Sequence, residues 1–169
     1  MKAVSKQNHL TWRRMVITGA VASAMLIAPL AVSAGECPAD KRVPDGQGQM
    51  PGATAPKDVT DTVRASTDLS KEPLALKDRL FRLRQLDIQP GGVVPWHSHA
   101  ERPAMIYIVS GEVIEYASNC AVPIVHKAGD VAPEKNGTSH WWKNPGADAA
   151  VLISVDIFPV QMNIEPHMM

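Results

Sequence analysis

Apolar and polar residues alternate in short runs over the second two thirds of the chain. Alternation with a period of two places one set of side chains on each face of a β-strand. Turn residues end each run, Gly91-Gly92 predicts a turn, and Ser110-Gly111-Glu112 is typical of a hairpin. The predicted strands are Val59–Leu69, Leu80–Ile88, Val93–His99, Ala104–Val109, Val113–Tyr116, Val122–His126, Val131–Pro133, His140–Lys143 and Val151–Phe158.

Eight or nine short strands without a long amphipathic helix predict an all-β domain, a sandwich or a closed barrel, over residues 58–160. Residues 35–57 are rich in proline and glycine and poor in large apolar side chains. Such a segment predicts a flexible linker or a peripheral wrap. Residues 161–169 are expected to form a C-terminal tail.

The first 34 residues have the pattern of an export signal. A basic stretch ends in Arg13-Arg14, an uncharged stretch runs to residue 34, and Val32-Ser33-Ala34 offers small residues for cleavage. The arginine pair resembles a twin-arginine signal, although Trp12 stands where that motif prefers Ser or Thr. An uncleaved membrane anchor is the alternative. We expect a periplasmic or secreted protein without stable membrane association after cleavage.

Composition and charge describe an ordinary globular protein. The 169 residues are 45% apolar and 20% charged, which excludes a collagen, a coiled coil and a wholly disordered chain. Residues 1–34 carry four basic groups and no acid, so the rest carries thirteen basic and seventeen acidic groups, a net charge of −4. No basic patch or motif indicates nucleic-acid binding.

The chain has two cysteines, Cys37 and Cys120, both beyond the predicted signal. An oxidising compartment would allow a disulfide between them. Unpaired thiols are the alternative, because sequence does not place the two Cα atoms within bonding reach.

The sequence His97-Ser98-His99 is the first candidate for chemistry. Alternate residues of a strand face the same side, so both imidazoles would point together. Two converging imidazoles form a chelate for a transition metal.

The surrounding residues resemble the two conserved blocks of the cupin superfamily. Residues 91–111 read GGVVPWHSHAERPAMIYIVSG, and residues 129–144 read GDVAPEKNGTSHWWKN. Eight positions fall in the family pattern, whereas Lys135 replaces its proline: Gly91, His97, His99, Gly111, Gly129, Gly137, His140 and Asn144.

The resemblance implies a single jelly-roll β-barrel, or double-stranded β-helix, with one divalent metal held by His97, His99 and His140. The family's fourth ligand, a glutamate, falls at Ala104, which cannot coordinate a metal. Either the site has three histidines, or Glu101 turns inward as a replacement.

Strand alternation predicts which residues surround the metal. Ala104, Ile106 and Trp142 should line the pocket, since Trp142 shares a face with His140. The opposite face of the same strand, with Met105, Tyr107 and Val109, would then need cover. Either a homodimer, which is common among cupins, or the N-terminal wrap would provide it.

Two functions follow from this resemblance. The first is a mononuclear oxidoreductase of the dioxygenase type, acting on a small chelating anion, with Fe(II) as the favoured metal and zinc, manganese, copper or nickel as alternatives. The second is a non-catalytic cupin that binds a small ligand or sequesters metal. No residue beyond the metal ligands presents itself as a catalytic base.

Overall fold

The computed structural model describes residues 35–160, which are almost entirely β structure. The predicted signal at 1–34 and the tail at 161–169 lie outside the described residues. The strands are β1 Lys57–Asp68, β2 Arg79–Ser98, β3 Ala104–Ser110, β4 Glu112–Ala117, β5 Ile124–Lys127, β6 Val131–Glu134, β7 Ser139–Lys143 and β8 Ala150–Pro159. Two short 3-10 helices, Ala39–Lys41 and Leu69–Lys71, complete the elements. Within residues 35–160 no helix has the length and apolar character needed to cross a bilayer.

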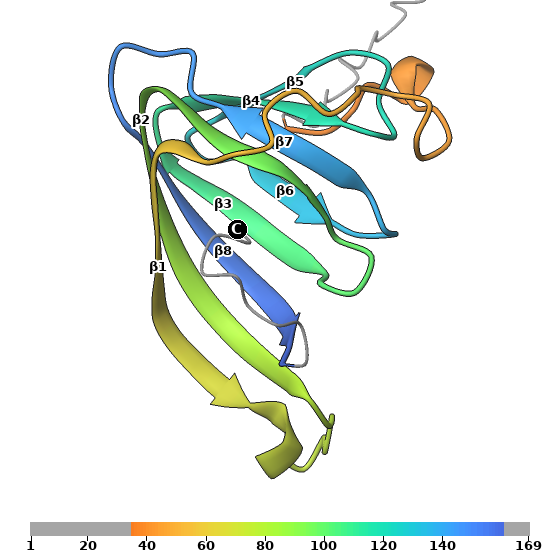
Figure 1. Cartoon of the computed structure of the whole chain (residues 1–169), viewed down its shortest axis with the longest axis vertical. Helices are drawn as coiled ribbons and strands as arrows, with labels where there is room; N and C mark the ends of the chain where they lie inside the picture. The colour runs from red at the N-terminus through yellow and green to blue at the C-terminus, as the bar shows by residue number, and fades with distance from the viewer. Residues whose placement is uncertain (1–34, 161–169) are drawn as a thin grey trace, which may run out of the picture. The chain divides into compact units, whose positions relative to one another are not determined.

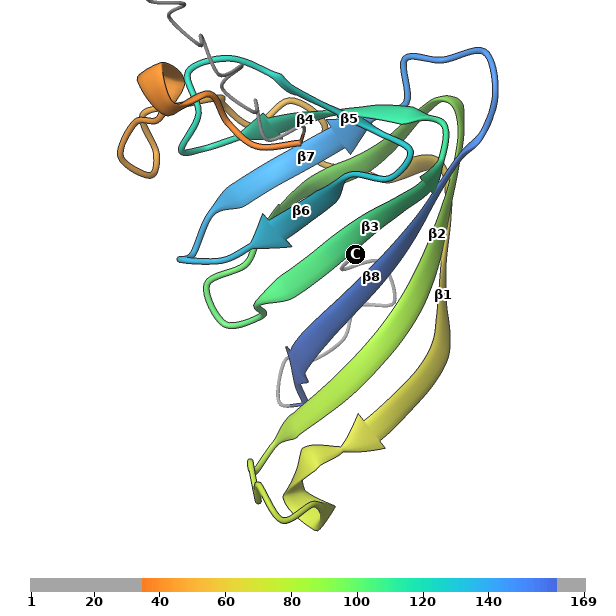
Figure 2. The same ribbon diagram turned by 180° about the vertical axis from the view of Figure 1, so that it is seen from behind.

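The strands form one eight-stranded sheet in the order β5-β4-β7-β2-β8-β3-β6, with β1 added along β2. Every pairing is antiparallel. The sheet rolls into a nearly closed barrel, in which β1, β2, β8 and β3 lie side by side and β7 and β4 cover the other side (Figures 1 and 2). The predicted all-β jelly-roll barrel is confirmed.

Strand β2 is longer than its sequence pattern predicted. We expected a turn at Gly91-Gly92, but one 20-residue strand continues through it. Gly91 has a φ of 72°, a left-handed conformation that glycine adopts without strain, and it bends the strand without reversing it. Residues before the bend pair with β8, and those after it pair with β7. The bend therefore carries β2, and with it His97, from one side of the barrel to the other.

Alternation along the strands fills the interior. In β3, Ala104, Ile106 and Ile108 are buried, whereas Met105 and Tyr107 are exposed. The interior cluster draws on six strands and consists of Leu86, Ile88, Val94, Ile106, Ile108, Val113, Ala132, Trp142, Ala150 and Leu152.

The segment from residue 35 to residue 49, here called the strap, has little regular structure but is tied to the barrel. The predicted disulfide is formed: the Cys37 and Cys120 sulfurs are 1.97 Å apart. Backbone N–H groups of Val43 and Gly48 donate to carbonyls just after β4, at 3.0 and 2.7 Å. At Gly48 a Cβ would lie 2.5 Å from Cys120 backbone atoms, so this close approach requires glycine. These contacts describe a wrap, the alternative to a free linker.

Candidate metal centre

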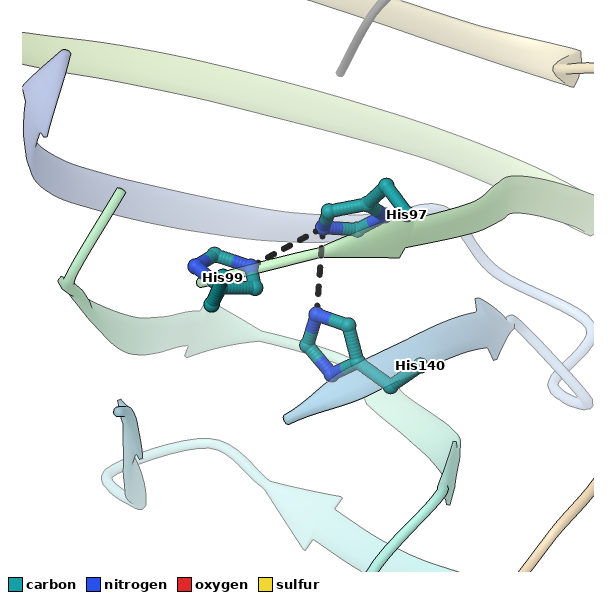
Figure 3. A group of neighbouring side chains, drawn as sticks. All are labelled: His97, His99 and His140. Carbon is teal, nitrogen blue, oxygen red and sulfur yellow. Dashed lines mark hydrogen bonds between the residues drawn. The ribbon is translucent and has the colours of Figure 1, made fainter. Parts of the chain in front are cut away.

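Three histidine side chains converge inside the barrel. His97 lies near the end of β2, His99 directly follows that strand, and His140 lies on β7, where it pairs with His97 in register. The Nε2 atom of His97 is 3.0 Å from Nε2 of His99 and 3.1 Å from Nε2 of His140. Figure 3 shows the three rings turned toward one point, with dashed lines at these two contacts.

The other ring nitrogen of each histidine faces an oxygen acceptor. Nδ1 of His97 donates to the carbonyl of Pro95 at 2.8 Å, and Nδ1 of His99 donates to the carbonyl of Arg102 at 2.6 Å. Since each Nδ1 carries the hydrogen, each Nε2 carries a lone pair.

His140 has the same arrangement. Its Nδ1 lies 2.7 Å from Oε1 of Glu115, and the indole N–H of Trp142 points at the same nitrogen from 2.9 Å. The two contacts compete, because one ring nitrogen cannot both donate and accept. The bond to the charged carboxylate is the stronger and makes His140 an Nδ1–H donor as well.

This arrangement fits a bound cation. Three lone pairs that meet at about 3 Å repel one another unless a positive charge lies among them. Burial and the neighbouring His140 lower the pKa of His97 well below its usual range, and the same causes lower the pKa of His99 to about 3. Protons are therefore poorly held there near neutral pH. Two nitrogens bound at about 2.1 Å and at 90° to one metal would be about 3.0 Å apart, so the donor set fits a transition metal.

Among the described residues, neither of the two other ligand positions adds a ligand atom to this group. Ala104 is buried and faces inward, as its strand parity predicted. Glu101 is exposed and lies outside both groups of potential ligands that the described residues form, whereas its neighbour Arg102 is buried beside Asp156. Exposure of Glu101 leaves the first of the two predicted alternatives, a site of three histidines, whereas the sequence did not indicate that Arg102 is buried.

Two buried glutamates lie behind His140. Glu115 on β4 accepts from His140 and, through Oε2, lies 2.8 Å from Nε2 of His126. Glu134 on β6 lies directly opposite Ala104 in the sheet, and its Oε2 is 3.4 Å from Nδ1 of His140. The carboxylate missing at Ala104 thus has a counterpart on the adjacent strand, on the Nδ1 side of His140.

The charge states of these glutamates differ. Burial alone would raise the pKa of Glu115, but hydrogen bonds from His126 and His140 outweigh it and lower that pKa to about 2. Burial, followed by the charge of Glu115, raises the pKa of Glu134 well above its usual range.

Sequence analysis missed this network. His126 is fully buried and stacks on Trp142, with ring centroids 4.7 Å apart. The available signal was parity: Glu115 alternates with Val113, and Glu134 with Ala132, so each is a charged residue on the interior face of its strand. A charged residue on the interior face of a strand needs a hydrogen-bond or ionic partner, because burying an unpaired charge is costly.

A small cavity of about 20 Å³ opens beside His97 and His99, here called the His pocket. Two of the three predicted pocket residues, Ile106 and Trp142, line it; Ala104 is buried but is not among the lining residues. The full lining is Arg84, Leu86, Val94, His97, His99, Ile106, Trp142 and Leu152.

Arg84 brings positive charge to the His pocket. Its guanidinium pairs with Asp61, lies 3.4 Å from Asp156 and donates to Ser154 at 3.2 Å. Arg82 and Arg102 also face Asp156, at 2.6 and 3.9 Å. Three guanidinium groups therefore share two carboxylates, and this group of five side chains carries a net positive charge.

Comparison with known proteins agrees with this geometry. Residues 84–156, which include all three histidines and both buried glutamates, match the cupin domain family Cupin_2. A germin-like protein of rice, Germin-like protein 8-14 of Oryza sativa subsp. japonica, is 34% identical over 73 residues, or 41% of this chain and 34% of the relative. The chain thus spans about a third of the length of that protein.

A solved structure shares the fold, and a second is reported beside it. A predicted oxalate decarboxylase from Thermotoga maritima has a TM-score of 0.50 and 21% identity, over 67% of this chain and 96% of that one. A protein with a double-stranded β-helix domain from Klebsiella pneumoniae subsp. pneumoniae has a TM-score of 0.47 and 23% identity, over 67% and 84% of the two chains. The fold and the family match agree over the barrel, and residues 84–156 form a cupin domain.

Proposed function

We propose that this cupin is an exported oxidoreductase that holds one divalent metal through His97, His99 and His140 and acts on a small chelating anion. The convergence of three unprotonated Nε2 atoms carries the proposal. Imidazole suits iron, zinc, copper and nickel, and Fe(II) is the favoured ion because an open three-histidine site leaves positions for both substrate and O₂. When bound, the metal would supply those positions and an electrophilic centre.

The charge around the His pocket supports an anionic substrate. Three neutral imidazoles leave the full charge of a divalent ion, and Arg84 adds positive charge at the cavity wall. The apolar side chains of Leu86, Val94 and Leu152 exclude water from the same wall and so strengthen these interactions.

The protein's own residues would hold the histidines in place. Glu115 keeps the hydrogen of His140 on Nδ1, and the carbonyls of Pro95 and Arg102 do the same for the other two rings. Such partners orient a ligand and raise its basicity.

A non-catalytic metal-binding cupin is the second candidate. The size of the His pocket favours it, since about 20 Å³ is room for little more than one water molecule. In this function the protein would sequester the metal without turnover.

The proposal also includes export of the protein from the cytoplasm. Arg13-Arg14 and the uncharged stretch after them support it, and the disulfide between Cys37 and Cys120 fits an oxidising compartment. Replacing Arg13-Arg14 by two lysines should retain the protein in the cytoplasm if the signal is of the twin-arginine type. Unchanged export would leave the general secretory route.

Metal analysis tests the site. Protein purified from its native compartment should contain one transition metal per chain, and His97→Ala and His140→Ala should lose it. Glu101→Ala is the matched control, because Glu101 is exposed and should not affect the metal. Loss of metal in the control, or its retention in both histidine variants, would contradict the assignment.

Oxygen uptake separates the two functions. Oxalate is a suitable first probe, because it is a very small chelating dicarboxylate and the Thermotoga relative is described as a predicted oxalate decarboxylase. An oxidase reaction consumes O₂ and releases carbon dioxide and hydrogen peroxide, whereas decarboxylation releases formate and carbon dioxide without O₂. Metal-loaded protein that turns over neither oxalate nor other small hydroxy and keto acids would favour the non-catalytic candidate.

A further inference from the structure

The strap begins beside a buried histidine nitrogen. Gly35 is its first residue, and a Cβ atom built on Gly35 would lie 3.0 Å from Nδ1 of His126 and 3.1 Å from Cβ of Asp130. The backbone nitrogen of Gly35 is two bonds from that Cβ position, so it lies at most about 5.5 Å from Nδ1 of His126. The first nitrogen of the strap is therefore close to both side chains.

Nδ1 of His126 has an unused lone pair. The imidazole is fully buried, and its Nε2 donates to the carboxylate of Glu115 at 2.8 Å. In a neutral ring with its hydrogen on Nε2, Nδ1 is an acceptor. That atom has no hydrogen-bond partner among the described residues. A buried acceptor without a donor is costly, so an N–H group is expected next to it.

Asp130 brings a carboxylate to the same place. Its Oδ2 accepts the backbone N–H of Lys127 at 2.8 Å, which leaves Oδ1 for a second donor. The carboxyl carbon of Asp130 lies 3.5 Å from the Cβ position of Gly35. A lone pair and a carboxylate side by side fit an ammonium group, which combines several N–H donors with a positive charge.

Cleavage of the predicted export signal would create such a group here. The small residues Val32-Ser33-Ala34 end directly before Gly35. In the uncleaved chain the nitrogen of Gly35 is an uncharged amide, and it donates to no backbone acceptor within residues 35–160. Hydrolysis of the bond before Gly35 consumes one water molecule and leaves a carboxylate on Ala34 and an amine on Gly35. At neutral pH that amine binds a proton and becomes an ammonium.

The residues after Gly35 hold the new terminus in place. Glu36 pairs with Arg42 at 3.0 Å, and Cys37 is bonded to Cys120. Because these two contacts fix the next two residues, only the torsions of Gly35 remain to direct its nitrogen. Docking of the terminus therefore costs little conformational entropy.

We propose that cleavage before Gly35 produces an amino terminus that docks as an ammonium between Nδ1 of His126 and the carboxylate of Asp130. The proposal rests on the export part of the proposed function. The docked terminus would extend the hydrogen bonds that run from His126 through Glu115 to the candidate metal centre. Removal of the signal would thus complete the buried network behind the metal ligands.

Acetylation of the amino terminus tests the docking. Protein purified from its native compartment is treated with limiting acetic anhydride at neutral pH, and the modified terminal peptide is quantified by mass spectrometry. We expect this peptide to begin at Gly35. Its amine should react at least about tenfold more slowly than in Asp130→Asn, because a paired ammonium keeps its proton and only the free amine reacts. Asp40→Asn removes an exposed carboxylate that faces Lys41 in the same strap and should leave the rate unchanged.

Two glycine variants provide a second test if Asp130→Asn does not fold. Gly35→Val places a side chain against His126 and should displace the amine, which raises its rate at least about tenfold. Gly46→Val is the matched control, because Gly46 also has a positive φ, of 79°, but has open space around its Cβ position. Its rate should equal that of the wild type.

The outcomes separate the docking from export. Equal rates in the wild type and Asp130→Asn, or in the wild type and Gly35→Val, would overturn the docking. Exported protein that begins at another residue would overturn the docking and leave export intact. Protein that keeps residues 1–34 in its native compartment would overturn both.

Discussion

The carboxylate of Glu115 fixes the hydrogen on His140, and this single contact links the inner face of β4 to the candidate metal centre. Glu115→Gln would keep the shape but replace the charged acceptor with an amide. We predict about 10- to 100-fold weaker metal binding with the fold retained, because a ligand of lower basicity binds the metal less tightly. Competition with a chromogenic chelator would measure the change.

The matched control lies on the same strand. Glu112→Gln removes a carboxylate that faces the exposed Lys127 at 3.8 Å and should leave metal affinity unchanged. Equal affinities for the Glu115 and Glu112 variants would show that the contact behind His140 does not influence the site.

Some residues of the site could be predicted from the sequence, and others could not. His97 and His99 are two residues apart, and each of the two cupin-like sequence blocks can be recognised from its own spacing, so all three histidines could be predicted. The positions of Glu115 and Glu134 depend on which strands become neighbours: Ala117 pairs with His140, and Glu134 pairs with Ala104. These pairings arise from the rolled sheet, so only the inward parity of each glutamate was available beforehand.

At the scale of the elements, the bend of β2 depends on Gly91. Its φ of 72° is unfavourable for side chains branched at Cβ, although a Cβ atom at this position would have open space around it. Gly91→Val should therefore destabilise the fold by about 1–2 kcal/mol through backbone strain alone. Chemical denaturation would measure it.

Asparagine provides the comparison, because it tolerates this backbone region better than valine. Gly91→Asn should lie between the wild type and Gly91→Val in stability. Equal stability of all three proteins would contradict a bend that needs a left-handed residue.

The disulfide closes a long loop between the strap and the barrel. Cys37 and Cys120 are 83 residues apart, and in the chain-entropy treatment a loop of this length contributes about 4 kcal/mol. The double variant Cys37→Ser/Cys120→Ser should lose about this much unfolding free energy in denaturant titrations. An unchanged midpoint would mean that the strap's hydrogen bonds suffice without the cross-link.

Local sequence patterns predicted the strands more reliably than they predicted the segments that join the strands. The alternation of β3 predicted both its existence and its inward face, and that of β4 predicted its existence. A pair of glycines occurs both in turns that reverse the chain and in bends within one strand. Gly91-Gly92 therefore did not show whether one strand or two strands lie here. The hydrogen bonds of the strap join residues about 70 apart in sequence, which no local pattern encodes.

At the scale of the whole described barrel, the outer face of the sheet remains apolar. Leu83 on β2 pairs with Val155 on β8, which pairs with Met105 on β3, so their side chains form a row. Met105 is 64% exposed and Tyr107 46% exposed. Exposed apolar rows of this kind mark association surfaces.

The homodimer predicted from the sequence would cover this row. Light scattering after size-exclusion chromatography should give twice the chain mass for the wild type, and Met105→Asp should shift the protein toward the monomer, because it places a charge in an apolar contact. Glu101→Gln, a change at an exposed site off this row, should not shift it. A monomeric wild type would contradict the prediction.

The central claim is that one metal ion lies among the Nε2 atoms of His97, His99 and His140. Anomalous diffraction at the absorption edge of the bound metal, from crystals of the natively loaded protein, tests it most directly. The account predicts one peak per chain, about 2.0–2.3 Å from each of the three Nε2 atoms. A peak between Glu115 and Glu134, or no peak at the histidines in protein shown to contain stoichiometric metal, would contradict it.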